Sequence, residues 1–267
     1  MKLSKKILVS GMLFITAAVF AFADDTASVQ KTNKKESETS VEEEYLRDPE
    51  GDIIQTLAES DDYDNKLVAL QYLSDALESG NTSPAVLQAL DRLAGEGITS
   101  QSRTNGRMMN NFPEIRRQAC LLMAKVPTEH SKNMLVSIAV ADNEPMVISA
   151  AVKSLGDIGI NNNDETVDAI AFANRRNQVL NPTSSLAMEV LNAYEALEGT
   201  TENKKTMVDS IARIASDYRY VTPVRQRAQK LLKKFTQNAS SSNDKKSTKS
   251  NTNKSNNNTS TAEVDGE

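Results

Sequence analysis

The sequence predicts an all-α fold in which helical hairpins stack in a row, and three observations support this prediction. Aromatic residues make up 4% of the 267 residues and Trp is absent, whereas β-sheet proteins are enriched in aromatic and β-branched side chains. Helix start and stop signals recur along the chain, with no convincing strand between them. One helical pattern with an alanine at its centre also returns several times.

The chain begins with a segment that has the three parts of a signal peptide. The basic start MKLSKK is followed by the apolar run ILVSGMLFITAAVFAF and by Ala21-Phe22-Ala23, a small-x-small cleavage site. The alternative is an uncleaved membrane anchor, but the run is rather short for one. We therefore expect cleavage after residue 23 and a mature protein of the bacterial periplasm or exterior, with no stable membrane insertion.

The mature chain is acidic and contains one cysteine. Without the three lysines of residues 1–23 it carries 28 basic and 36 acidic residues, which argues against nucleic-acid binding because phosphate contacts need clustered Lys and Arg. The lone Cys120 excludes an internal disulfide, so the protein must rely on its core. Residues 24–39 and 237–267 are polar and aperiodic. We predict a disordered linker and a disordered tail around a repeat domain at 40–236.

About ten helices of 10–16 residues are expected in this domain. Ser40 with Glu43 is a possible capping box, and the acids at 61–64 precede the helical run KLVALQYLSDAL. Ser83-Pro84 opens PAVLQALDRLA with Ser as N-cap and Pro at the first helical position. Further starts carry Pro near the first turn and further ends precede Gly, where a left-handed cap is common: Pro113, Pro145, Asn181-Pro182 and Thr222-Pro223; Gly80, Gly95, Gly159 and Gly199.

The stretch PMVISAAVKSLGDIG, residues 145–159, repeats along the chain. Its apolar positions are four residues apart, and an alanine holds the central position in five copies. A small residue there lets two helix axes approach closely where they cross. A second apolar helix accompanies the copies, so the unit is a helical hairpin that needs neighbours to bury its apolar faces. The central alanines are Ala69, Ala119, Ala151, Ala187 and Ala228.

These residues also resemble a known family. The pattern Pro-x-Val-x-x-x-Ala-x-x-x-Leu-Gly-x-x-Gly at 145–159 is similar to the first helix of a HEAT repeat, and Pro113-x-Ile-Arg-x-x-Ala119 and Thr222-Pro-Val-Arg-x-x-Ala228 match its opening half. The resemblance spans about residues 50–235. It implies a right-handed α-solenoid of about five hairpins, with the second helices lining a concave face, and a protein-binding role without a cofactor.

The sequence offers no evident catalytic or metal-binding set. His130 and Cys120 are the only His and Cys; Cys120 falls on an apolar packing position, and we expect His130 to be exposed in a first turn. One residue of each type is too few for zinc. Asp61, Asp62 and Asp64 lack the Gly and Glu of a calcium loop, and helix capping explains them more simply. Some relatives in the family are bilin lyases, but nothing beyond the repeat supports that chemistry.

The candidate partner-binding residues are basic side chains and methionines. Residues 95–112 form the one long insertion, and long loops in compact domains are often functional. Exposed Met suits an adaptable contact, and local positive charge could hold an acidic partner or an anionic envelope polymer. The alternative is that each arginine bonds helix-end carbonyls or pairs with an acid on the next repeat, such as Asp157. The candidates are Arg103, Arg107, Met108, Met109, Arg116, Arg117, Arg175 and Arg176.

We therefore predict a non-catalytic scaffold that binds another envelope or periplasmic protein over a broad face. Two alternatives stay open. One is an envelope enzyme that acts on glycans through paired carboxylates, since any acidic protein offers such pairs. The other is a structural component of an envelope assembly. A fold alone does not specify a function, so the function depends on the residues of the binding surface.

Overall fold

The structure, a computed structural model, describes the backbone of residues 48–252 and the side chains of residues 48–237. The chain divides into two units, 1–46 and 47–267, and the description concerns the second. The predicted signal peptide at 1–23, the linker at 24–39 and the capping box at Ser40 lie outside the described residues, as do residues 253–267 of the predicted tail.

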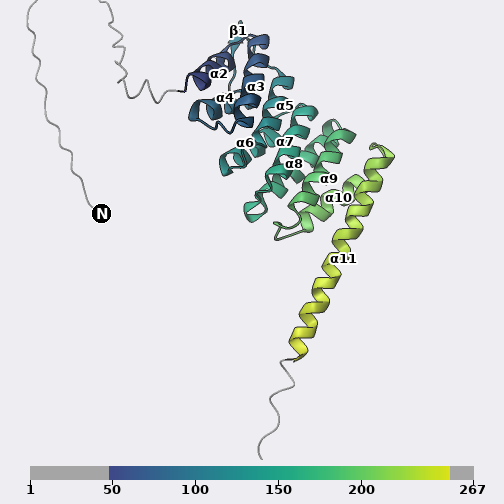
Figure 1. Cartoon of the computed structure of the whole chain (residues 1–267). Helices are drawn as coiled ribbons and strands as arrows, with labels where there is room; N and C mark the ends of the chain where they lie inside the picture. The colour runs from purple at the N-terminus through teal and green to yellow at the C-terminus, as the bar shows by residue number, and fades with distance from the viewer. Residues whose placement is uncertain (1–47, 253–267) are drawn as a thin grey trace, which may run out of the picture. The chain divides into compact units, whose positions relative to one another are not determined.

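The described residues contain ten α-helices and almost no strand (Figure 1). Helix makes up 72% of them, which confirms the all-α class. The remaining elements are the short strands β1 (Arg103–Thr104) and β2 (Arg107–Met108) and the 3-10 turn η1 (Asn162–Asp164). The helices are α2 (Pro49–Glu59), α3 (Tyr63–Glu78), α4 (Pro84–Ala94), α5 (Pro113–Met123), α6 (Glu129–Ala141), α7 (Pro145–Ile158), α8 (Glu165–Leu180), α9 (Ser184–Leu197), α10 (Lys205–Ser216) and α11 (Thr222–Thr252).

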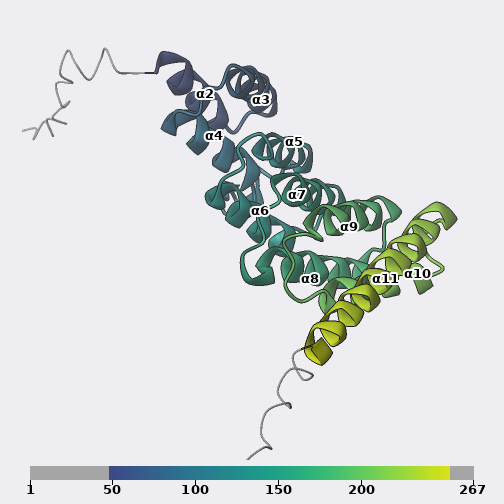
Figure 2. The same ribbon diagram turned by 60° about the horizontal axis from the view of Figure 1, so that its bottom comes forward.

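Successive helices alternate between two rows (Figures 1 and 2). In the row of odd-numbered helices, called the odd row, α3 packs on α5, α5 on α7, α7 on α9 and α9 on α11. In the even row, α2 packs on α4, α6 on α8, and α8 on α10. Each helix therefore contacts helices one hairpin away, which is consistent with an α-solenoid.

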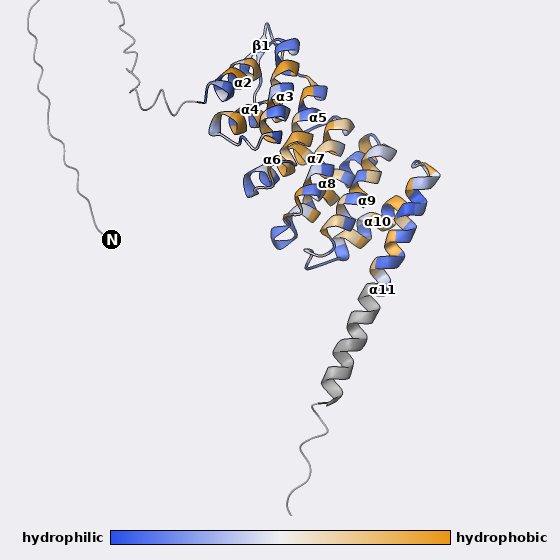
Figure 3. Ribbon diagram, in the orientation of Figure 1, coloured by the Kyte–Doolittle hydropathy of each residue, from blue (hydrophilic) through white to orange (hydrophobic). Residues whose placement is uncertain are grey.

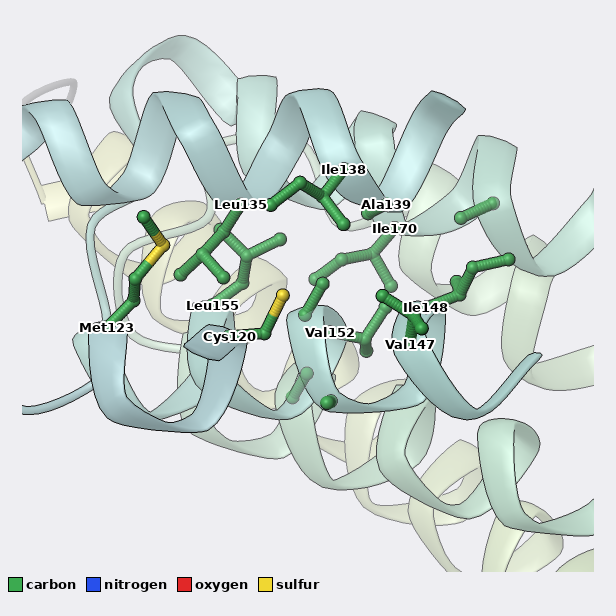
Figure 4. Packing of buried hydrophobic residues seen from close by; sticks show 14 of the residues in the cluster. Cys120, Met123, Leu135, Ile138, Ala139, Val147, Ile148, Val152, Leu155 and Ile170 are labelled. Atoms are coloured by element: carbon green, nitrogen blue, oxygen red, sulfur yellow. The ribbon is translucent and has the colours of Figure 1, made fainter. Parts of the chain in front are cut away.

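A continuous hydrophobic core lies between the two rows. Figure 3 shows apolar and polar residues alternating around the helices, and Figure 4 shows Cys120, Val152 and Leu155 among apolar side chains of neighbouring helices. All five central alanines are at most 1% exposed. Their burial confirms the prediction that the repeated small residue faces the core.

Gly156 marks the closest approach of two odd-row helices. A Cβ atom added there would lie 2.9 Å from Ala193 Cα, too close for a side chain. Glycine thus lets α7 and α9 cross with their backbones nearly touching, as small residues at a crossing point allow. The repeat pattern alone had indicated the alanines of α7, not this glycine, as the point of close approach.

The predicted helix boundaries are confirmed at most positions. Ser83 and Asp62 cap α4 and α3 with their side chains, as expected, whereas Asp61 accepts a hydrogen bond from the Ser102 hydroxyl and Asp64 lies in the first turn of α3. Gly159 ends α7 in the left-handed conformation, with φ of 73°. The expectation was wrong at Gly95, whose φ is −88°, and at Gly199, which is not left-handed either. It was also wrong at Pro182, which precedes the N-cap Thr183 of α9 instead of opening the helix.

Two segments differ from the sequence-based description. The insertion was expected to lack strands, but β1 and β2 pair as an antiparallel hairpin. Asn105 and Gly106 connect them with φ of 51° and 80°, as a type I′ turn requires. Helix α11 continues to Thr252, beyond residue 236 where we placed the end of the repeat domain.

Candidate partner-binding surface

The interhelical turns form two opposite edges of the array. Turns from an even helix to the next odd helix make one edge, called here the insertion edge: 60–62, 95–112, 142–144, 181–183 and 217–221. Turns from an odd to an even helix make the other, called the polar edge: 79–83, 124–128, 159–164 and 198–204. Hydrogen bonds join neighbouring turns along each edge, for example Ser102 to Asp61 on the first and Asn161 to Thr200 on the second.

Buried charged and polar groups fix the base of the insertion. Lys66 of α3 lies 3.0 Å from the Glu96 carboxylate, and both side chains are fully buried. Lys66 also donates to the Ala58 carbonyl at the end of α2. Asn110 is buried as well; its side chain accepts from the Ser102 amide and donates to the Ser100 carbonyl. The insertion therefore leaves the core from a rigid base.

The tip of the insertion presents the predicted contact residues to solvent. Arg103 and Arg107 are exposed on β1 and β2, and Met109 is 48% exposed. Met108 is half-buried and faces Arg103 across the hairpin. Among the described side chains, the Arg103 guanidinium bonds only that of Gln101, two residues earlier. Cationic and thioether groups thus stand together at the tip.

Arg116 does not belong to this exposed group. It is 2% exposed, and its guanidinium holds the Asp142 carboxylate at 2.7 Å and the Glu96 carbonyl at 3.2 Å. Arg117, the next residue, is partly exposed and pairs with Glu114 on its own helix. A partner cannot reach Arg116, so the prediction that it binds a partner is wrong. Arg116 is instead a structural link between consecutive hairpins.

The two arginines near the end of α8 also have different surroundings. Arg176 donates to the Val140 and Asp142 carbonyls at the end of α6, so the alternative of helix-end bonding describes it. Arg175 is exposed and forms no hydrogen bond or ion pair with the described residues. We therefore keep Arg175 in the candidate surface and remove Arg116 and Arg176.

Arg175 lines a small polar pocket between α8 and α10. The pocket holds about 110 Å³, and its lining includes Arg213 and Asp209 of α10. Its floor contains Asn174, which is 2% exposed and donates to Ser210 at 3.0 Å. No local sequence pattern indicates this pocket, because α8 and α10 belong to different hairpins.

An apolar group protrudes from the insertion edge beside this pocket. We name Val179, Leu180, Tyr218 and Val221 the edge patch; they are 77%, 71%, 86% and 53% exposed. A hydrogen bond of 3.0 Å between the Gln178 and Asp217 side chains joins its two halves. On the polar edge, by contrast, no large hydrophobic residue of the described chain is exposed.

Charged side chains surround the edge patch. The Arg225 guanidinium lies 5.1 Å from the centre of the Tyr218 ring, a cation–π distance. Arg219 pairs with Asp217 at 2.7 Å and lowers the pKa of this carboxyl below its usual value. Exposed aliphatic, aromatic and arginine side chains together are the composition of protein contact sites.

The residues considered for catalysis are not brought together. Cys120 is fully buried, and burial raises the pKa of its thiol, so it is a structural residue as predicted. His130 is exposed in the first turn of α6, and its Nε2 lies 2.6 Å from the Asp91 carboxylate. Within residues 48–237, no three His, Cys, Asp or Glu side chains are placed to hold a metal.

Neither a membrane-spanning helix among the described residues nor a known relative helps to assign the surface. No helix in the part of the chain described here has the length and apolar character needed to cross a membrane. Comparison with protein-family models gives no match for the chain, and neither the curated proteins nor the solved structures contain a match.

Proposed function

We propose that this protein is an exported, non-catalytic scaffold of the bacterial envelope that binds another envelope or periplasmic protein. Its repeat domain would be a right-handed α-solenoid of about five HEAT-like hairpins. The observation that carries the proposal is the difference between the two edges. Within the described residues, Met109 and the edge patch expose apolar side chains beside arginines on the insertion edge, whereas no large hydrophobic residue is exposed on the polar edge. Such asymmetry marks an interaction surface.

The insertion tip supports this proposal in its chemistry. Arg103, Arg107 and Met109 stand on a hairpin whose base is buried, so the tip is held in place while its long side chains adapt. A rigid support reduces the entropy lost on binding. The contact is one of shape and charge over an extended edge, in keeping with the broad face expected of a HEAT-like array.

Photocrosslinking in cells tests the proposal. A photoreactive amino acid at Met109 is expected to capture one protein species of the envelope. The same group at Thr82, an exposed position on the polar edge, is the matched control and should capture none. Capture of the same species from both positions, or of only scattered products from Met109, would contradict a contact along the insertion edge.

The export component has its own test. The mature protein, isolated from the periplasm or the medium, should begin at Asp24, directly after the predicted cleavage site. A chain that keeps residues 1–23 and sediments with membranes would show the anchored alternative instead. Gel filtration of the mature chain distinguishes an adaptor, which elutes as a defined small species, from a component of a large homopolymer.

A further inference from the structure

The α8–α10 pocket and the edge patch form one continuous surface. Arg213 lines the pocket and also the adjoining groove, which includes Val179 and Arg219. The Val221 amide donates to the Ser184 hydroxyl, so the 217–221 turn lies against the start of α9, directly after the end of α8. A recessed polar site therefore stands next to protruding apolar side chains.

The pocket has unused cationic capacity. Arg175 and Arg213 both line it, and neither guanidinium is hydrogen bonded or ion paired within residues 48–237. Thr206 and Ser210 add hydroxyl groups, whereas Asp209 supplies the one acidic side chain of the lining. The two arginines leave a net positive charge. A cavity of about 110 Å³ accommodates a carboxylate, since one of about 10–15 Å³ already holds a water molecule.

The charge of the surrounding segment agrees with an acidic ligand. Residues 204–237 contain nine basic and two acidic residues. Four of the basic side chains pair with Glu195, Glu198 or Asp217, and the other five outnumber the remaining acid, Asp209. Residues 48–94, at the other end of the array, contain two basic and ten acidic residues. An acidic segment is therefore attracted to the C-terminal end of the domain, although the whole chain has a net charge of −5.

We propose that this surface binds an acidic segment of a partner protein. A side-chain carboxylate of that segment enters the pocket between Arg175 and Arg213, and a neighbouring apolar side chain packs on the edge patch against Tyr218. The inference rests on the proposed function, because it supplies a second contact for the same scaffold. A protein segment fits better than a lipid surface: a flat bilayer would touch the protruding patch but not a recessed pocket.

A peptide titration with the mature chain tests this inference. The probe is a fluorescein-labelled peptide in which glutamate alternates with leucine, followed by fluorescence anisotropy. The variant Arg175→Gln/Arg213→Gln is expected to weaken binding about tenfold, as loss of charged hydrogen bonds does. The matched control Lys125→Gln/Lys153→Gln removes the same charge from two exposed positions outside the proposed contact and should change binding by less than about threefold. Circular dichroism verifies that both variants are folded.

A third variant, Tyr218→Ser, tests the apolar half and should weaken binding several-fold. Three results would overturn the inference: no binding of the glutamate–leucine peptide, equal weakening by both double variants, or competition by phosphatidylglycerol vesicles together with binding of a charge-reversed peptide in which lysine alternates with leucine. None of these three results changes the expectation that a photoreactive group at Met109 captures a partner protein. Failure of the pocket and failure of the scaffold are thus distinguishable.

Discussion

The two edges of the helical array consist of the same kind of turn but use their polar groups differently. On the polar edge, Asp164 accepts hydrogen bonds from the amides of Glu202 and Asn203, one hairpin further along. Buried Lys132 likewise reaches Glu165 of the next hairpin at 2.6 Å. On the insertion edge, such links lie at the base, and apolar and cationic side chains protrude beyond them.

This difference shows how a repeat protein can separate stability from binding. Links between hairpins are needed at every step, because each hairpin is stabilised by its neighbours. Protruding groups such as Met109 and Tyr218 add nothing to that stacking and expose apolar surface to water. We therefore expect substitutions at the links to change stability, and substitutions of protruding groups to change partner binding.

The largest effect is expected at the base of the insertion. Lys66→Met should destabilise the protein by about 3–5 kcal/mol, because it leaves the Glu96 carboxylate buried without its partner. Urea unfolding followed by circular dichroism measures the loss. The double variant Lys66→Met/Glu96→Leu is the control and should recover most of it. A single variant as stable as the parent would show that the pair is not a structural link.

The crossing of α7 and α9 should give the next largest effect. Gly156→Ala places a methyl group against the Ala193 backbone and should cost about 1–3 kcal/mol through overpacking. Gly199→Ala is the matched control, since nothing lies within 4 Å of an added Cβ there. Thermal unfolding compares the two variants. Equal stability would contradict the close approach of the two helices.

A smaller, pH-dependent effect is expected on the polar edge. The amides of Asn203 and Glu202 lower the pKa of Asp164 below its usual 3.8, although burial opposes them. The stabilisation that these hydrogen bonds give the fold is therefore present above the usual pKa of the carboxyl, and it is lost as the pH falls through the lowered pKa of Asp164. Asp164→Ala should cost about 1 kcal/mol at pH 7, and the difference from the parent should shrink in acid. A difference that grows in acid would contradict this assignment.

The smallest effect on stability is expected at the edge patch. Val179→Ser/Leu180→Ser should change the free energy of unfolding by less than about 0.5 kcal/mol, since both side chains are already in water. The same variant should weaken capture of the partner. If it instead destabilises the protein by more than 1 kcal/mol, these residues belong to the packed structure and the contrast between the edges fails.

The sequence predicted the parts of the structure that depend on local patterns. The five central alanines, the capped start at Ser83 and the buried Cys120 all follow from helical spacing and short signals. The β-hairpin at the insertion tip was missed, although Asn105-Gly106 is a known hairpin turn signal. Adjacent Arg116 and Arg117 were treated alike, but only Arg116 shares the helix face of buried Ala119 and Cys120.

The remaining features depend on how hairpins stack. Lys66 and Glu96 are 30 residues apart, and Asn174 and Ser210 are 36 apart. No local pattern specifies such pairs, because their geometry follows from the packing of one hairpin on the next. The proposed surface takes Arg and Met of the insertion and Arg175 from the sequence, and these stay predictions. Its continuation along the edge to Val179 and Tyr218 comes from the structure.

Hydrogen–deuterium exchange of the scaffold with and without its captured partner tests the central claim most directly. The proposed contact predicts slower exchange in segments 100–110, 178–183 and 217–222 when the partner is bound, with 79–83 and 198–204 unchanged. Protection confined to the latter two segments would show that the partner binds the polar edge, and the assignment of the two edges would be wrong.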